Sequence, residues 1–190
     1  MSDSFKVSIV DHTSMAKEPD TRPSPPAHRP GKKITLERTL KATTREVWDL
    51  WTTKKGLESW WGPAGFVTKV RRLEVSPGGK FEYEMTAIGP EQVAAMKKAD
   101  LPLTSRARGT YVEVTPRRRL AYRTLADFIP GVTPYEVGAV IDFHAVPGGV
   151  RVTVTEDAMH NEEWTKMSEM GMSSSLDRLE KVAGSRRKVL

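Results

Sequence analysis

The stretch that most constrains the fold is a long amphipathic segment near the end of the chain, residues 161–183. Asn161 is a favourable N-cap, and two glutamates after it place negative charge where the helix dipole is positive. Gly184 stands where a C-cap glycine is expected. One face forms a stripe at helical spacing: Trp164, Met167, Gly171, Ser174, Leu176, Leu179, Val182 and Ala183. Such a helix needs a large apolar surface to cover it, so it organises the fold.

The middle of this helix lacks the bulky residues that usually fill an interior. Gly171 and the run from Ser173 to Ser175 remove side-chain volume from the centre of the stripe. One interpretation is an open space between the helix and the surface that it faces. The other is an exposed polar face or close helix packing, and the sequence favours neither.

The region from residue 33 to residue 157 is predicted to consist mainly of β-strands. Phe81, Tyr83 and Met85 share one face while Glu82 and Glu84 share the other, which is typical of a sheet with one buried face. Because the last six strands follow one another closely, we expect them to pair as an antiparallel meander. The predicted strands span residues 33–40, 66–75, 80–87, 107–115, 120–126, 135–146 and 150–156.

Two short helices are predicted between the first and second strands. Thr43 or Thr44 caps the first, with Glu46 in its first turn, and the second ends before Gly62 and Pro63. The predicted fold class is therefore α+β. A curved antiparallel sheet of about seven strands surrounds the long C-terminal helix, in the order β-α-α-β-β-β-β-β-β-α.

The connections between strands fall into two groups, which a meander places at opposite ends of the sheet. Short turns at residues 76–79, 115–118 and 146–149 contain Pro or Gly. The other end receives longer, partly apolar links, where binding residues more often lie. Residues 89–99 in one of these links carry a helical signal, and we expect an inserted helix that acts as a lid.

Composition predicts one domain with an extension at each end. Residues 1–32 form a proline-rich N-terminal extension, residues 33–184 form the domain, and residues 185–190 form a basic tail. We expect residues 5–10 to form a short strand that adds to a free sheet edge. The first ten residues lack the apolar core of a signal peptide, and no run reaches roughly 20 apolar residues. We therefore predict a cytoplasmic protein without membrane insertion.

Several kinds of functional site are excluded by residue type and spacing. The chain has no cysteine, and its four histidines show no metal-ligand spacing, so neither a metal nor a cofactor is expected. The Pro-Gly-Gly segments each join two strands, whereas a phosphate loop leads from a strand into a helix. The net charge of +6 comes from clusters in turns and ends. No nucleic-acid-binding motif accompanies them, so no nucleic-acid partner is predicted.

Particular residues occur along the chain in a characteristic order: Arg38, Val47-Trp48, Trp60-Trp61-Gly62-Pro63, Pro77-Gly78-Gly79-Lys80-Phe81, Gly109, Tyr111, Glu113, Leu176 and Leu179. In this order they resemble a known superfamily, the START-like or SRPBCC helix-grip proteins. The resemblance covers about residues 32–182 and is strongest to the branch related to the activator of the ninety-kilodalton heat-shock chaperone ATPase. It implies a cavity between sheet and last helix that takes hydrophobic ligands, lipids or polyketides.

We predict that a small hydrophobic or aromatic ligand binds in this cavity. Adjacent tryptophans at a helix end point in different directions, so one of Trp60 and Trp61 can anchor the core while the other reaches the loop end of the sheet. The alternative is that both tryptophans pack in the core. The predicted lining is Trp61, Phe66, Phe81, Tyr83, Met85, Tyr122, Phe143, Trp164 and Met167.

Two other functions stay open. One is a chaperone-associated or other protein-interaction domain, and the other is a cyclase-like or hydrolase-like enzyme that uses polar groups in the same cavity. Glu113, Asp142 and Glu156 lie on predicted strands, but the sequence does not indicate whether any of them converge. No catalytic residue is therefore assigned, and binding is preferred to catalysis.

Overall fold

The computed structural model describes residues 31–129 and 131–186, so the strand expected at residues 5–10 lies outside the described residues. The residues that are described form seven strands and four helices. In order they are β1 (Lys33–Leu40), α1 (Thr44–Thr52), α2 (Lys54–Trp60), β2 (Phe66–Leu73), β3 (Lys80–Ala87), α3 (Pro90–Lys98), β4 (Thr104–Thr115), β5 (Arg119–Ala126), β6 (Tyr135–Val146), β7 (Gly149–Asp157) and α4 (Glu162–Arg186).

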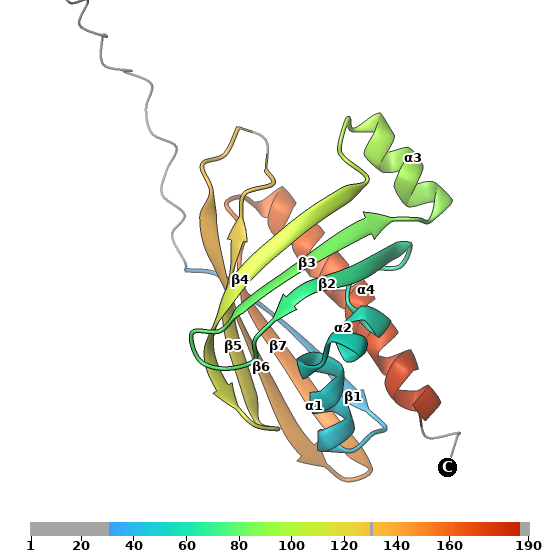
Figure 1. Cartoon of the computed structure of the whole chain (residues 1–190), viewed down its shortest axis with the longest axis vertical. Helices are drawn as coiled ribbons and strands as arrows, with labels where there is room; N and C mark the ends of the chain where they lie inside the picture. The colour runs from blue at the N-terminus through green and yellow to red at the C-terminus, as the bar shows by residue number, and fades with distance from the viewer. Residues whose placement is uncertain (1–30, 130, 187–190) are drawn as a thin grey trace, which may run out of the picture.

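The seven strands form one antiparallel sheet in the order β1-β7-β6-β5-β4-β3-β2. Strands β2 to β7 make the predicted meander, and β1 pairs with β7 at one edge. The sheet curls around α4, while α1 and α2 lie beside the helix near one end (Figure 1). The α+β helix-grip fold is confirmed.

Helix α4 begins where the sequence predicts and ends later. The side-chain oxygen of Asn161 accepts a hydrogen bond from the backbone N–H of Trp164 at 2.9 Å, as expected of an N-cap. The predicted C-cap at Gly184 is wrong, because the helix continues through Gly184 to Arg186. A glycine permits a helix to end but does not force it to, and the Ser185 hydroxyl bonds the Val182 carbonyl within the continuing turn.

The two short helices are fixed to the core by a cap and a buried tryptophan. Thr43 and Glu46 form a reciprocal capping box at the start of α1. The indole N–H of Trp60, at the end of α2, donates to the carbonyl of Leu50 in α1 at 3.0 Å. Trp60 is fully buried and packs against Trp51, with ring centroids 4.7 Å apart. These contacts close one end of the concave side of the sheet.

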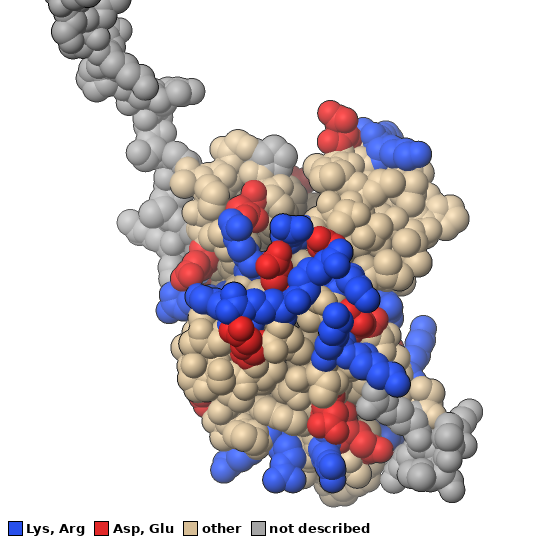
Figure 2. Space-filling model, in the orientation of Figure 1, with Lys and Arg blue, Asp and Glu red and all other residues tan. Residues whose placement is uncertain are grey.

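The outer face of the sheet is charged. Figure 2 shows a band of Lys and Arg interleaved with Asp and Glu across this face. Arg71 and Arg106 both pair with Glu84, at 2.6 and 3.0 Å, and Arg108 pairs with Asp127 at 2.9 Å. Because the arginines are solvent-exposed, each pair contributes little to stability. The apolar side chains of the sheet are thus concentrated on the concave side.

Phe81 on β3 lies over Gly109 of β4. The two residues are register partners, and a Cβ atom at position 109 would collide with the Phe81 ring and the Arg123 carbonyl. The ring of Phe81 packs edge-on against Tyr122, with centroids 5.3 Å apart. The missing side chain of Gly109 therefore makes room for a buried aromatic ring.

Gly109→Ala is expected to lower the free energy of unfolding by about 1–3 kcal/mol, because the ring must shift to admit the methyl group. Gly171→Ala on α4 is the matched control, since none of the described atoms lies within 4 Å of a Cβ added there. The free energy of unfolding of this control should rise by up to about 1 kcal/mol, because alanine has a higher helix propensity than glycine. Urea unfolding measures both variants, and wild-type stability in Gly109→Ala would contradict this account of the packing.

Candidate functional site

A cavity of about 430 Å³ lies between the sheet and the N-terminal half of α4. Its volume falls within the range of roughly 300–1,000 Å³ that is usual for small-molecule pockets. Strands β2 to β7, α4 and the long links contribute to its lining, which is mostly apolar and aromatic. It therefore lies away from the Pro-Gly-Gly turns, in the half of the sheet that receives the longer links.

Seven of the nine predicted site residues line this cavity: Trp61, Phe66, Tyr83, Met85, Tyr122, Trp164 and Met167. The other two, Phe81 and Phe143, are buried in the core instead. Phe143 packs edge-on against Trp48 and Trp51 of α1, with centroids 5.6 and 6.0 Å apart. The phase of a strand predicts which face a residue occupies, but it does not predict how far along the strand the filled core extends.

The change from filled core to open cavity takes place between two adjacent rows of inward-facing residues. Leu120, Ile141 and Val154 lie side by side on β5, β6 and β7 and are at most 1% exposed. The next inward row, towards the long links, lines the cavity and consists of Tyr122, Ala139 and Glu156. Small Ala139 in the middle of that row leaves room that a larger side chain would fill.

The small residues of α4 serve two purposes. Gly171 and Ser175 line the cavity, so they supply part of its open volume. The Ser174 hydroxyl accepts a hydrogen bond from the backbone N–H of Ala64 at 3.0 Å. The Ser173 hydroxyl accepts one from the guanidinium of Arg38, also at 3.0 Å. The helix is thus bonded to its neighbours through Ser173 and Ser174, while Gly171 and Ser175, on either side of them, face the cavity.

Arg178 fixes the loop that carries two aromatic residues into the cavity. Its Nη1 atom donates to the carbonyl oxygens of Gly62, Pro63 and Phe66 at 2.8, 3.2 and 3.0 Å. Partial burial lowers the pKa of this guanidinium from its ordinary value. These bonds hold the loop against α4 and set the positions of Trp61 and Phe66.

Glu156 places a carboxyl group on the wall of this mostly apolar cavity. Burial raises its pKa to about 7, and the nearby charge of Asp157 adds to the shift. Within the described part of the chain, no side chain donates a hydrogen bond to this carboxyl or forms an ion pair with it. The sequence contains the signal for its position, because the alternation of Val152 and Val154 continues to Glu156.

Tyrosine hydroxyls accompany this carboxyl group. Burial raises the pKa of Tyr83 to about 12, and the charge of Glu156 contributes to the shift. Burial also raises the pKa of Tyr122 well above its ordinary value, again with a contribution from Glu156. Both tyrosines therefore stay protonated at neutral pH. The cavity thus combines one ionisable carboxyl group with neutral hydroxyl groups.

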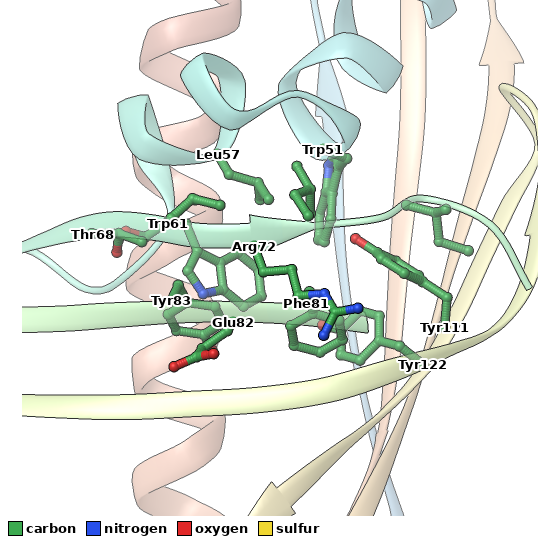
Figure 3. Close-up of a pocket in the computed structure, with 13 residues that line it drawn as sticks. Trp51, Leu57, Trp61, Thr68, Arg72, Phe81, Glu82, Tyr83, Tyr111 and Tyr122 are labelled. Atoms are coloured by element: carbon green, nitrogen blue, oxygen red, sulfur yellow. The ribbon is translucent and has the colours of Figure 1, made fainter. Parts of the chain in front are cut away.

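A second, smaller space of about 30 Å³ lies between α2 and strands β2 and β3 (Figure 3). Its volume is close to that of a single water molecule, which is too small for an organic ligand. Trp61, Tyr83 and Tyr122 border both spaces and form the wall between them. Trp60 is fully buried while its neighbour Trp61 reaches the large cavity, which agrees with the first of the two interpretations of these adjacent tryptophans.

Helix α3 is present at the predicted place but does not cover the cavity. It lies beyond the ends of β2 to β4, on the side of the long links (Figure 1). The backbone N–H groups of Ile88 and Gly89, just before it, donate to the carbonyl of Gly65. All residues of α3 are described, and none of them lines the cavity. The helix is held at the ends of these strands and does not cover the cavity, so its action as a lid stays a prediction.

Two kinds of feature are absent from residues 31–129 and 131–186. These residues contain no group of three or more acidic or histidine side chains arranged to hold a metal ion. They also contain no helix with the length and hydropathy that a membrane span requires.

A family model described as "Activator of Hsp90 ATPase homolog 1-like protein" (AHSA1) matches residues 41–184. The chain belongs to the AHSA1-like family. This assignment confirms the resemblance of the sequence to the helix-grip superfamily and to that branch within it. A search of curated proteins found no match to this AHSA1-like chain.

Solved structures from several bacteria share the fold. A protein from Chromobacterium violaceum is 22% identical, with a TM-score of 0.65, and the match covers 80% of this chain and 96% of that one. The AHSA1 protein from Silicibacter pomeroyi is 18% identical, with a TM-score of 0.64 and coverages of 82% and 99%. The AHSA1-like protein from Aeromonas hydrophila is 20% identical, with a TM-score of 0.62 and coverages of 82% and 94%. At sequence identities this low, the similarity to these proteins shows a shared fold only.

The raised pKa of Glu156 predicts a pH-dependent change in stability. Between its ordinary value of 4.5 and about 7, the native protein binds more protons than the unfolded chain. The stabilising contribution of protonated Glu156 to the free energy of unfolding is therefore fully present below pH 4.5, and it is lost as the pH rises to about 7. Relative to wild type, Glu156→Gln should gain on the order of 2–3 kcal/mol in unfolding free energy between pH 5 and pH 8.

Urea unfolding of both proteins at the two pH values measures this difference. Glu180→Gln, which removes the same charge from an exposed position on α4, is the control and should follow wild type. A parallel pH dependence of Glu156→Gln and wild type would show that the carboxyl is not buried.

Proposed function

We propose that this AHSA1-like chain binds a small hydrophobic or aromatic ligand between the sheet and α4. The cavity of about 430 Å³ is the observation that carries the proposal. An empty space of this size lowers the stability of the fold, because its walls lose van der Waals contacts. A function that uses the space would explain why it is kept. Mostly apolar walls with a few polar groups are typical of ligand sites.

A protein-interaction role is the alternative that the family description suggests, since it refers to an activator of the Hsp90 ATPase. Exposed apolar side chains such as Phe128, Met167 and Met170 are 50%, 51% and 64% exposed and would suit such contacts. Two of them, Phe128 and Met167, also line the cavity, so the same surface suits entry of a ligand. The cytoplasmic location predicted from the sequence remains a proposal.

An enzymatic role is favoured by one observation, the carboxyl group of Glu156. A pKa of about 7 suits a group that gives and takes protons near neutral pH. Within the described residues, however, Glu156 lacks the hydrogen-bonded partner that usually orients a catalytic base. Binding is therefore the better-supported function.

Ligand binding is expected to raise the melting temperature of the purified chain. A ligand at 100 times its dissociation constant adds roughly 2.7 kcal/mol to stability. For a chain of this size the shift is about 5–10 °C. Native mass spectrometry for a co-purified molecule, followed by a thermal-shift screen of lipids, sterols and aromatic compounds, tests the proposal. Absence of both a bound molecule and any shift would overturn it.

Gly171→Leu should abolish the ligand-induced shift while keeping the protein folded. Gly171 lines the cavity, and with no described atom within 4 Å of an added Cβ the leucine side chain has room to enter it. Gly184→Leu is the matched control, because that glycine is also helical and open but lies outside the cavity. Both variants gain helix propensity, and only the first should lose binding. An undiminished shift in Gly171→Leu would place the ligand elsewhere.

A further inference from the structure

We propose that the cavity selects ligands that carry a positively charged amine on an apolar body, with the carboxylate of Glu156 as the group that binds the amine. The inference rests on the proposed binding function and specifies the chemical class of the ligand. It depends on the position of this carboxyl, on the aromatic walls around it, and on where the positive charges of the protein lie.

The position of Glu156 makes its carboxyl available to a ligand. It occupies the inward face of β7, in the row that begins the open part of the cavity, beside Ala139. Its sequence neighbour Asp157 bonds Lys33 at 2.7 Å and the backbone N–H of Gly138 at 2.9 Å. Glu156 has no such partner among the described residues. Glu156 is partly exposed to the cavity, where the apolar walls disfavour an unpaired carboxylate, and a cationic ligand would supply the missing ion pair.

Aromatic rings on several sides of the cavity also favour a cation. The negative face of an aromatic ring attracts an ammonium group, most strongly where water is excluded. The same rings provide apolar contact area for the body of the ligand. The aromatic residues in the lining are Trp61, Phe66, Tyr83, Tyr122, Phe128 and Trp164.

Among residues 31–129 and 131–186, the cavity lining offers no unpaired positive charge to an acidic ligand. Arg106 is the one Lys or Arg that these residues contribute to the lining, and its guanidinium pairs with Glu82 and Glu84 at 3.3 and 3.0 Å. Those two glutamates alternate with inward Tyr83 and so face outward. Arg178, near the loop, is bound to three carbonyl oxygens. A fatty acid would therefore bring its carboxylate beside Glu156 without a counter-charge.

The test compares three probes that share one tail: decylamine, decanol and decanoate. Tryptophan fluorescence of the full chain reports binding, because Trp61 and Trp164 line the cavity. At pH 8 decylamine should bind at least about tenfold more tightly than decanol, and decanoate should bind most weakly. The net charge of +6 would favour the opposite order at long range, so an amine preference must come from the site.

The amine preference should also depend on pH and on Glu156. Since only the ionised carboxyl pairs with the amine, decylamine should bind about tenfold more tightly at pH 8 than at pH 6, whereas decanol should not change. Glu156→Gln should abolish the preference and its pH dependence, and Glu180→Gln should retain both. Equal binding of the three probes, tightest binding of decanoate, or a preference that survives Glu156→Gln would overturn the amine proposal and leave the binding function standing. If no probe binds and the broader screen is also negative, both proposals fail.

Discussion

The burial of one half of α4 is the constraint on which the rest of the structure depends. Leu176 and Leu179 are fully buried against the sheet and the two short helices, and they fix the helix across the concave face. The sheet must curl to cover them, and it does so with one apolar face and one charged face. In the other half of the same helix, Gly171 and Ser175 line the cavity, where they leave space that bulky side chains would fill. One continuous helix thus creates both the core and the cavity.

The cavity places a charge in an environment that disfavours charge. Glu156 follows two buried valines on β7, in a phase that turns its carboxyl inward rather than towards water. Its raised pKa is the electrostatic result of that placement. A side chain that weakens the folded state at neutral pH is typical of a functional position, where stability is given up for binding or chemistry.

Much of this architecture could be predicted from the sequence, because strand phase and helix spacing are local properties. The inward direction of Tyr83 and Met85 follows from a period of two residues. The helical period places Gly171 on the apolar stripe of α4, but the sequence left open whether a space lies there. The point along the sheet where the filled core ends could not be predicted, because it depends on where α1 and α2 pack. Phe81 and Phe143 lie in the part of the core that these two helices cover. The position of α3 beyond the strand ends is fixed by a further non-local contact, the hydrogen bonds from Ile88 and Gly89 to the carbonyl of Gly65.

The three hydrogen bonds from Arg178 have a mechanical consequence. They join the loop of residues 62–66 to α4, so the two move as one body. Any displacement of the helix away from the sheet must carry Trp61 and Phe66 with it. The cavity therefore cannot widen between this loop and α4. The opposite rim is held differently, by a ring contact between Phe128 and Trp164 with centroids 5.8 Å apart. An aromatic pair is worth about 0.5–1.5 kcal/mol, less than three hydrogen bonds from a charged guanidinium, so we expect the rim at Phe128 and Trp164 to open more readily than the rim at Arg178.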